Sequence, residues 1–137
     1  MKNSILSSRF SLFLLLFLTV ISLKTVAANP IVIAIDVSPS VLNLQNQGEV
    51  VTVHTSIAYN LVAGSTVSLN GIEISWWKSD DRGYFVAKFL MSDVKSLKGL
   101  VIGGYNTLTL SGVTKDGVSF TGSQDIKVIN NIPAGKK

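Results

Sequence analysis

The sequence predicts an all-β domain in which two antiparallel sheets pack face to face. Short runs of alternating apolar and polar residues recur along the chain, and turn-forming Gly, Asn, Asp or Pro residues separate them at intervals of roughly 8–12 residues. Only residues 91–98 have the spacing of a helix. The 137 residues suffice for one domain, and the absence of cysteine excludes disulfides, thiolate zinc sites and cysteine nucleophiles.

The amino-terminal segment indicates export. Lys2 and Arg9 accompany an apolar run, residues 10–23, and residues 26–28 (Val-Ala-Ala) are small enough for signal peptidase to cleave after them. The run is shorter than the roughly 20 residues that span a bilayer. We therefore expect residues 1–28 to be a cleaved signal peptide. The mature protein would be periplasmic or extracellular, without a stable membrane anchor.

The basic residues that set the net charge lie near the two ends of the chain. The sequence has 12 Lys and Arg against 8 Asp and Glu, but three of the cations belong to the leader and two are the last two residues. Residues 29–135 thus carry 7 cations and 8 acids. Because nucleic-acid binding needs a concentrated basic face, this composition argues against nucleic acid as a partner.

The first strands follow the leader directly. Residues 31–37 alternate, and Pro39 bends the chain because proline cannot donate to a β-ladder. Residues 41–44 then resume the strand, as in sandwiches whose first strand passes from one sheet to the other. Residues 49–57 predict a second strand, and residues 67–69 a short third one.

The centre of the chain predicts a hairpin with a defined register. Residues 72–77 and 84–89 are joined by a loop, residues 78–83, and we expect Trp77 to pair with Tyr84. This register makes one face apolar (Ile72, Ile74 and Trp76 opposite Phe89, Ala87 and Phe85) and sends the other residues outwards (Glu73, Ser75 and Trp77 opposite Lys88, Val86 and Tyr84). A slip by one residue would bury Glu73 and Lys88. We therefore expect Trp76 in the core and Trp77 on the surface.

The last third of the chain predicts a second hairpin. After a single helical turn within residues 91–98, residues 105–129 form two alternating runs around Asp116-Gly117, a dipeptide that favours a tight turn. Leu110 and Val113 differ in parity, so we expect a bulge near Ser111-Gly112. Residues 131–137 are expected to be a mobile tail.

These segments together predict an immunoglobulin-like antiparallel β-sandwich of about seven strands over residues 29–130. A closed barrel is the alternative, because the alternation of residues along the strands is the same in both architectures.

Several short motifs resemble an immunoglobulin-like module of secreted and cell-surface proteins of bacteria and archaea. Residues 35–39 (Ile-Asp-Val-Ser-Pro), 42–44 (Leu-Asn-Leu) and the strand after Gly48 are similar to the opening of that module. Its later strands are matched by residues 67–71, 86–89 and 110–128. The resemblance covers roughly residues 33–129. It implies a spacer or accessory domain of a prokaryotic surface protein.

Many relatives carry an Asp-rich loop that looks able to bind calcium. The corresponding loop here, residues 78–83 (Lys-Ser-Asp-Asp-Arg-Gly), has two carboxylates flanked by two cations. Calcium takes six to eight oxygen ligands, so we expect a solvated hairpin tip and neither a metal nor another cofactor.

The residues that could carry catalysis form no recognisable set. His54 is the only histidine, it is expected on the outer face of its strand, and no Ser–His–acid spacing accompanies it. The carboxylates fall at strand ends, in turns or opposite a lysine (Glu49, Asp80, Asp81 and Glu73). We therefore expect a non-catalytic protein.

Trp77 and Tyr84 are the residues with the clearest functional implication. Exposed aromatic residues on a sandwich can anchor a protein partner or stack on sugar rings, and Ser75 and Glu73 beside them could accept hydroxyl protons. Alternatively, both rings cover the edge of the core or pack on the loop 58–65. We expect a module that presents a surface or an edge strand to an unknown protein at the cell surface. The alternative is a carbohydrate-binding module that uses Trp77 and Tyr84.

Overall fold

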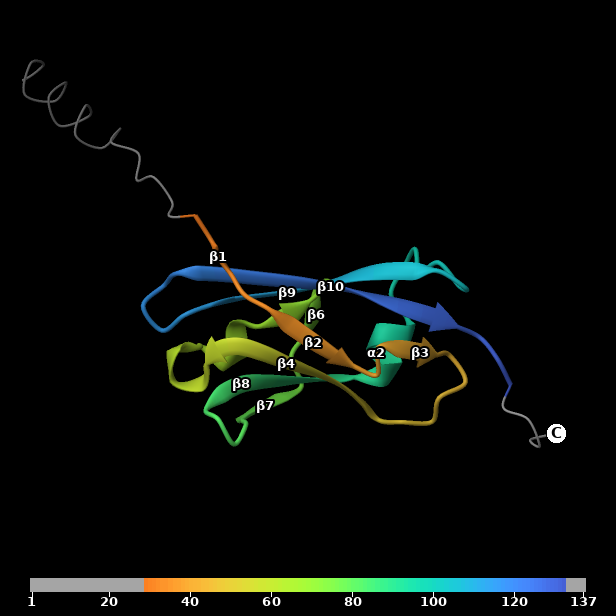
Figure 1. Ribbon diagram of the computed structural model, residues 1–137, viewed down its shortest axis with the longest axis horizontal. Helices are drawn as coiled ribbons and strands as arrows, with labels where there is room; N and C mark the ends of the chain where they lie inside the picture. Colours follow the sequence, from red (N-terminus) through yellow and green to blue (C-terminus); the bar gives the residue numbers. More distant parts are fainter. Residues whose placement is uncertain (1–28, 133–137) are drawn as a thin grey trace, which may run out of the picture.

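The protein consists of two β-sheets that enclose one core, and buried and exposed residues alternate along the longer strands. The computed structural model describes residues 29–132 (Figure 1). The predicted signal peptide and the last five residues of the predicted tail lie outside this range. The first sheet contains six strands, in the order β1-β10-β9-β5-β6 with β3 also paired to β10 (β1 Ile31–Val32, β3 Val41–Asn43, β5 Ser68–Leu69, β6 Ile72–Glu73, β9 Tyr105–Val113 and β10 Ser119–Ile129). The second has the order β2-β4-β8-β7 (β2 Ile35–Ser38, β4 Val50–Ala58, β7 Trp76–Ser79 and β8 Tyr84–Leu90).

The main strands in chain order are β2, β4, β5, β7, β8, β9 and β10. The first, second, fourth and fifth of them form one sheet, and the third, sixth and seventh form the other, which is the strand order of an immunoglobulin-like sandwich. The predicted fold class is confirmed, and the two separate sheets decide against a closed barrel. The structure has ten strands rather than about seven, because two predicted strands are each divided between the sheets. Short helical segments complete the fold (η1 Tyr59–Leu61, η2 Gly64–Thr66 and α2 Met91–Lys95).

Pro39 marks one of these divisions, as expected. β1 and β3 pair in parallel with β10, while β2 between them pairs antiparallel with β4. The chain thus crosses from the first sheet to the second and returns after the proline.

The core is formed by the inward-facing residues of both sheets. The largest fully buried side chains include three phenylalanines and four leucines (Phe85, Phe89, Phe120, Leu42, Leu69, Leu108 and Leu110). β9 and β10 pair without interruption from Ser119–Val113 to Lys127–Tyr105, so the predicted bulge near Ser111-Gly112 is wrong. Gly112 instead stands opposite Phe120 in the buried row, where a Cβ would lie 2.5 Å from the Phe120 ring. The parity change therefore reflects space for a ring rather than an extra residue.

The predicted register of the central hairpin is also wrong. Residues 72–77 do not form one strand, because the chain leaves the first sheet after β6 and enters the second at β7. In the structure Trp76 stands opposite Lys88, and Trp77 opposite Ala87, which is a shift of three residues from the expected pairing. An odd shift exchanges the two faces. Trp76, predicted in the core, is 46% exposed on the outer face, and Trp77 is on the face that carries the buried Ala87.

The turn after β7 explains the shift. The Asp80 N–H donates to the Tyr84 carbonyl oxygen, and the Gly83 N–H donates to that of Asp80, which closes a four-residue turn. The Asp80 side chain accepts two further backbone hydrogen bonds, from Arg82 and Tyr84. Asp and Gly are favoured at the first and fourth positions of a type I turn. The turn is therefore shorter than the predicted loop, and the hairpin gains Lys78 and Ser79.

Candidate functional site

β7 is an open edge of the four-stranded sheet. All four of its residues are exposed, and it pairs only with β8 within residues 29–132. Because the Asp80 N–H bonds to Tyr84, the alternation of an antiparallel ladder directs the backbone groups of Trp76 and Lys78 towards β8 and those of Trp77 and Ser79 away from the sheet. No backbone hydrogen bond outside the ladder involves Trp77 or Ser79 in the described part of the chain. The outer side of β7 is thus free to pair with another strand.

The opposite edge of this sheet is partly closed. β2 lies there, and the Val37 N–H donates to Oε1 of Gln124, a side chain from β10, at 2.7 Å. The edge strands of the other sheet are shorter, with two or three residues each. β7 therefore offers the longest edge left without such cover.

Trp76 lies on the outer face of β7 beside two lysines. The Lys88 ammonium is 5.3 Å from the centroid of the Trp76 ring and donates to Thr52 Oγ1 at 2.7 Å. Partial burial lowers the pKa of Lys88, and the neighbouring charge of Lys78 lowers it further. The indole is thus associated with a cation on one side while almost half of its surface stays exposed.

Trp77 projects from the other face of β7 and packs on the segment that follows β4. A Cβ at Gly64 would lie 2.2 Å from Cε2 of the Trp77 indole, so the ring occupies the space above this glycine in η2. This is the packing on loop 58–65 that the sequence left as an alternative. Even so, 39% of Trp77 stays exposed, and β7 carries an indole on each face.

Tyr84 is separated from Trp77. It shares the outer face with Trp76 but stands at the far end of the hairpin, opposite Ala58, with the Arg82 guanidinium 5.4 Å from its ring centroid. Tyr84 and Arg82 line a hollow of about 510 Å³ together with His54 and Asp36, which are paired across β4 and β2. The predicted Trp77–Tyr84 platform is therefore not formed.

Ser75 and Glu73, the other two predicted contact residues, lie in different parts of the fold. Ser75 is exposed directly before β7, where its N–H donates to the Lys88 carbonyl oxygen at 2.9 Å. Glu73 is in β6 opposite Ser68, in the other sheet, so it does not pair with Lys88. The predicted set is therefore not assembled as one site, and the sequence interpretation missed Trp76 and Lys78. The Asp80–Gly83 turn signal could have indicated both.

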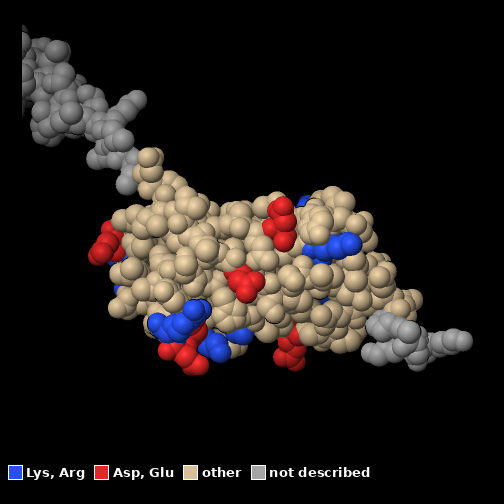
Figure 2. Space-filling view, in the orientation of Figure 1, with Lys and Arg blue, Asp and Glu red and all other residues tan. Residues whose placement is uncertain are grey.

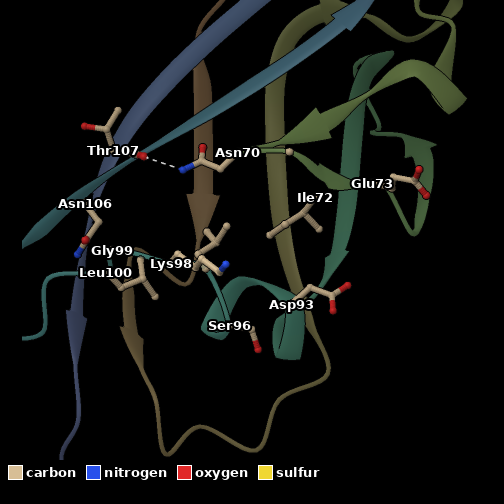
Figure 3. A pocket seen from close by; sticks show the side chains of 12 residues that line it. Asn70, Ile72, Glu73, Asp93, Ser96, Lys98, Gly99, Leu100, Asn106 and Thr107 are labelled. Atoms are coloured by element: carbon tan, nitrogen blue, oxygen red, sulfur yellow. Dashed lines mark hydrogen bonds between the residues drawn. The ribbon is translucent and has the colours of Figure 1, made fainter.

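A larger groove lies between the β5–β6 turn, α2 with the segment after it, and the start of β9 (Figure 3). Its volume is about 880 Å³. Two of its polar side chains already have partners, because the Asn70 amide bonds the backbone of β9 and the Asn106 amide bonds the backbone of residues 101 and 104. Glu73, Asp93 and Lys98 are the charged groups around it, without an aromatic residue. The groove therefore lacks the stacking surface that the β7 edge has.

Charged side chains are sparse on the side of the molecule in Figure 2, and both signs gather over the β7–β8 turn. Asp80 in this turn is committed to the backbone. The Tyr84 N–H is the main cause that lowers the pKa of Asp80, and Arg82 contributes through its N–H and its charge. Among residues 29–132, no three His, Asp or Glu side chains are grouped so that they could hold a metal ion. None of the described helices is long and apolar enough to cross a membrane.

Comparisons of the chain with protein-family models, curated proteins and solved structures found no match. The evidence on function therefore comes from the site itself.

Proposed function

We propose that this protein is an exported, non-catalytic immunoglobulin-like module that binds a protein partner at the cell surface by pairing along β7. The observation that carries the proposal is the open edge of β7 with an indole on each of its faces. The leader and the motifs shared with prokaryotic surface modules support export and an accessory role.

Strand addition uses the two kinds of group that β7 presents. A partner strand would receive main-chain hydrogen bonds from Trp77 and Ser79, and its side chains would lie beside Trp76 and Trp77. Tryptophan is enriched among the residues that dominate binding energies, because a large ring excludes water from the contact. A natural edge strand this exposed is otherwise a hazard for unwanted pairing, and Lys78 at its centre limits such pairing.

The carbohydrate alternative has less support from the geometry. It rested on Trp77 and Tyr84 side by side, and the two rings project from different faces of the hairpin. Trp76 could still stack on a sugar, although Lys88 lies over its ring. A glycan array therefore serves as the counter-test.

The test is capture of a partner from exporting cells with mature protein, identification by mass spectrometry, and titration with the purified partner. Ser79→Pro removes an outward N–H without breaking the β8 ladder, and Trp76→Ala removes an anchor. Each should weaken binding by at least about tenfold. Tyr105→Ala, at a 71% exposed aromatic residue of β9, is the matched control. Full-strength binding by both β7 variants, or binding on the glycan array instead, would refute the proposal.

A further inference from the structure

We infer that the strand accepted by β7 belongs to another protein and is acidic, with a carboxylate opposite Lys78 and apolar residues opposite Trp76 and Trp77. The inference rests on the proposed edge pairing and adds the chemistry of the partner. It depends on the uneven distribution of charge around β7.

The strands that form the outer face beside β7 carry lysines and no acids, and the acids of this region are in the turn. Lys78 and Lys88 are in adjacent strands, and neither β7 nor β8 contains an acidic residue. The next strand, β4, contributes the neutral Thr52 and the single histidine to this face and likewise has no acid. The acids nearest in sequence are Asp80 and Asp81 of the turn, and Asp80 accepts two backbone hydrogen bonds there. Because neither β7 nor the strands beside it supply an acid, a carboxylate directly opposite Lys78 would come from an added strand.

Sheet geometry specifies where this carboxylate would be. A residue directly opposite Lys78 in an added strand lies on the outer face, with its Cβ about 4.5–5.5 Å from that of Lys78. The residue opposite Trp76 shares this face, and the one opposite Trp77 points to the other face. An antiparallel partner would thus read acidic, apolar, apolar along three consecutive positions.

A second copy of this chain fits less well. In an antiparallel dimer of two β7 edges, the outward N–H and C=O groups of Trp77 and Ser79 must pair with those of Trp77 or Ser79 in the second copy. This condition allows a two-fold axis at residue 77, 78 or 79. An axis at residue 79 places Lys78 against Asp80, but β7 ends at Ser79, so this register pairs Ser79 alone among the outward residues of the strand. An axis at residue 78 places Lys78 against Lys78. An axis at residue 77 places Lys78 against Trp76, whose ring already has Lys88 over it, and thus gathers two lysines from each copy. Like charges in adjacent strands oppose pairing.

The probe is a synthetic peptide of about nine residues that alternates Thr and Val except for a central Glu-Val-Val, in which the Glu would meet Lys78 and the two valines Trp77 and Trp76. Versions with Gln or Lys at this position vary the charge alone. Binding to the mature chain is followed by tryptophan fluorescence at low and high salt, roughly 0.02 M and 0.5 M. Oligomeric state is measured in parallel by light scattering.

We expect the Glu peptide to bind at least about fivefold more tightly than the Gln peptide at low salt, and this preference to shrink at high salt. Lys78→Glu should reverse the preference, so that the Lys peptide binds best. Lys115→Glu, which changes an exposed lysine in the β9–β10 turn, should leave the preference unchanged.

The experiment distinguishes an error in the inferred acidic partner from an error in the proposed pairing along β7. If all three peptides bind equally and Ser79→Pro abolishes their binding, β7 pairs with strands but does not select acidic ones. If no peptide binds, or if Lys78→Glu leaves the order of affinities unchanged, the inference is wrong. A stable dimer that Ser79→Pro dissociates would identify a second copy as the occupant.

Discussion

At the scale of single residues, the indole of Trp77 occupies the place where residue 64 would otherwise have a side chain. A Cβ there would lie 2.2 Å from Cε2 and 2.5 Å from Nε1 of the ring. Such distances are far below van der Waals contact, so any larger residue must displace the indole. Gly64 therefore determines how Trp77 lies against the sandwich, and with it one face of the β7 edge.

Gly64→Ala should lower the free energy of unfolding by about 1–3 kcal/mol, the usual cost of overpacking. Urea unfolding measures this loss, and a red shift of Trp77 fluorescence in a Trp76→Phe background would report the displaced ring. In a Trp77→Ala background the same glycine substitution should cost little. A cost that persists there would place the strain in the backbone of η2.

Asp80 makes the stability of the β7–β8 turn depend on pH. Hydrogen bonds from Tyr84 and Arg82 hold the pKa of its carboxyl below the ordinary value of 3.8. Since the pKa is lower in the folded than in the unfolded chain, the carboxylate stabilises the fold above pH 3.8, and this contribution is lost as the pH falls through the folded pKa. Asp80→Ala should thus destabilise at neutral pH and converge with the wild type in acid. Asp81→Ala, which removes the neighbouring carboxylate of the same turn, is the control in pH-dependent melts.

At the scale of the elements, the two edges of the four-stranded sheet differ because a side chain from the other sheet reaches one of them. Gln124 of β10 accepts the Val37 N–H of β2, whereas nothing in the described part of the chain covers β7. The bond also ties the two sheets together at a partly buried position.

Gln124→Ala should cost about 1–3 kcal/mol, because it leaves the Val37 N–H without its acceptor in a partly buried place. Gln124→Glu retains an oxygen at the same reach and should cost less at neutral pH. Equal losses for the two variants in urea melts would show that packing, rather than the hydrogen bond, explains the role of Gln124. Gln45→Ala, which removes an exposed side-chain bond to Asn130, is the control.

The structure of the turn between β7 and β8 argues against calcium binding there. We expect millimolar calcium to leave the melting temperature unchanged, because the Asp80 carboxylate is occupied by backbone N–H groups and cations flank it. A rise of several degrees that the double substitution Asp80→Asn, Asp81→Asn removes would restore the calcium interpretation.

At the scale of the whole molecule, the chain has no cysteine, so its stability depends on the packing of the two sheets. Phe85 and Phe89 from one sheet and Phe120 from the other are fully buried. The tryptophans, the largest side chains of the sequence, lie at the periphery. The interior and the β7 edge therefore use different aromatic residues.

Phe120→Ala should reduce the free energy of unfolding by about 3–5 kcal/mol, as expected for a buried aromatic ring. Trp76→Ala should cost much less, since almost half of its surface is exposed. Urea melts of the two variants check the order. Equal losses would favour the register that the sequence suggested, with Trp76 in the core.

The fold class and most of the strands followed from the pattern of residues along the chain. Alternation located β4, β9 and β10, and Pro39 marked the crossing between the sheets. These features were predictable because each depends on local periodicity or on a missing backbone donor.

The arrangement of the β7 edge, in contrast, depended on contacts between distant parts of the chain. Trp76 and Trp77 are adjacent and equally apolar, so alternation is satisfied whichever of them points inwards. Ile72 and Ile74 led us to expect Trp76 on the inner face, but the chain changes sheets at Ile74-Ser75, so β6 and β7 have different partners. The apparent pair of Glu73 with Lys88 disappeared for the same reason. The register of paired strands is set by the turn that joins them and by the packing of both sheets. Here the hydrogen bonds of Asp80 close a short turn, and the β7–β8 pairing differs by three residues from the expected one.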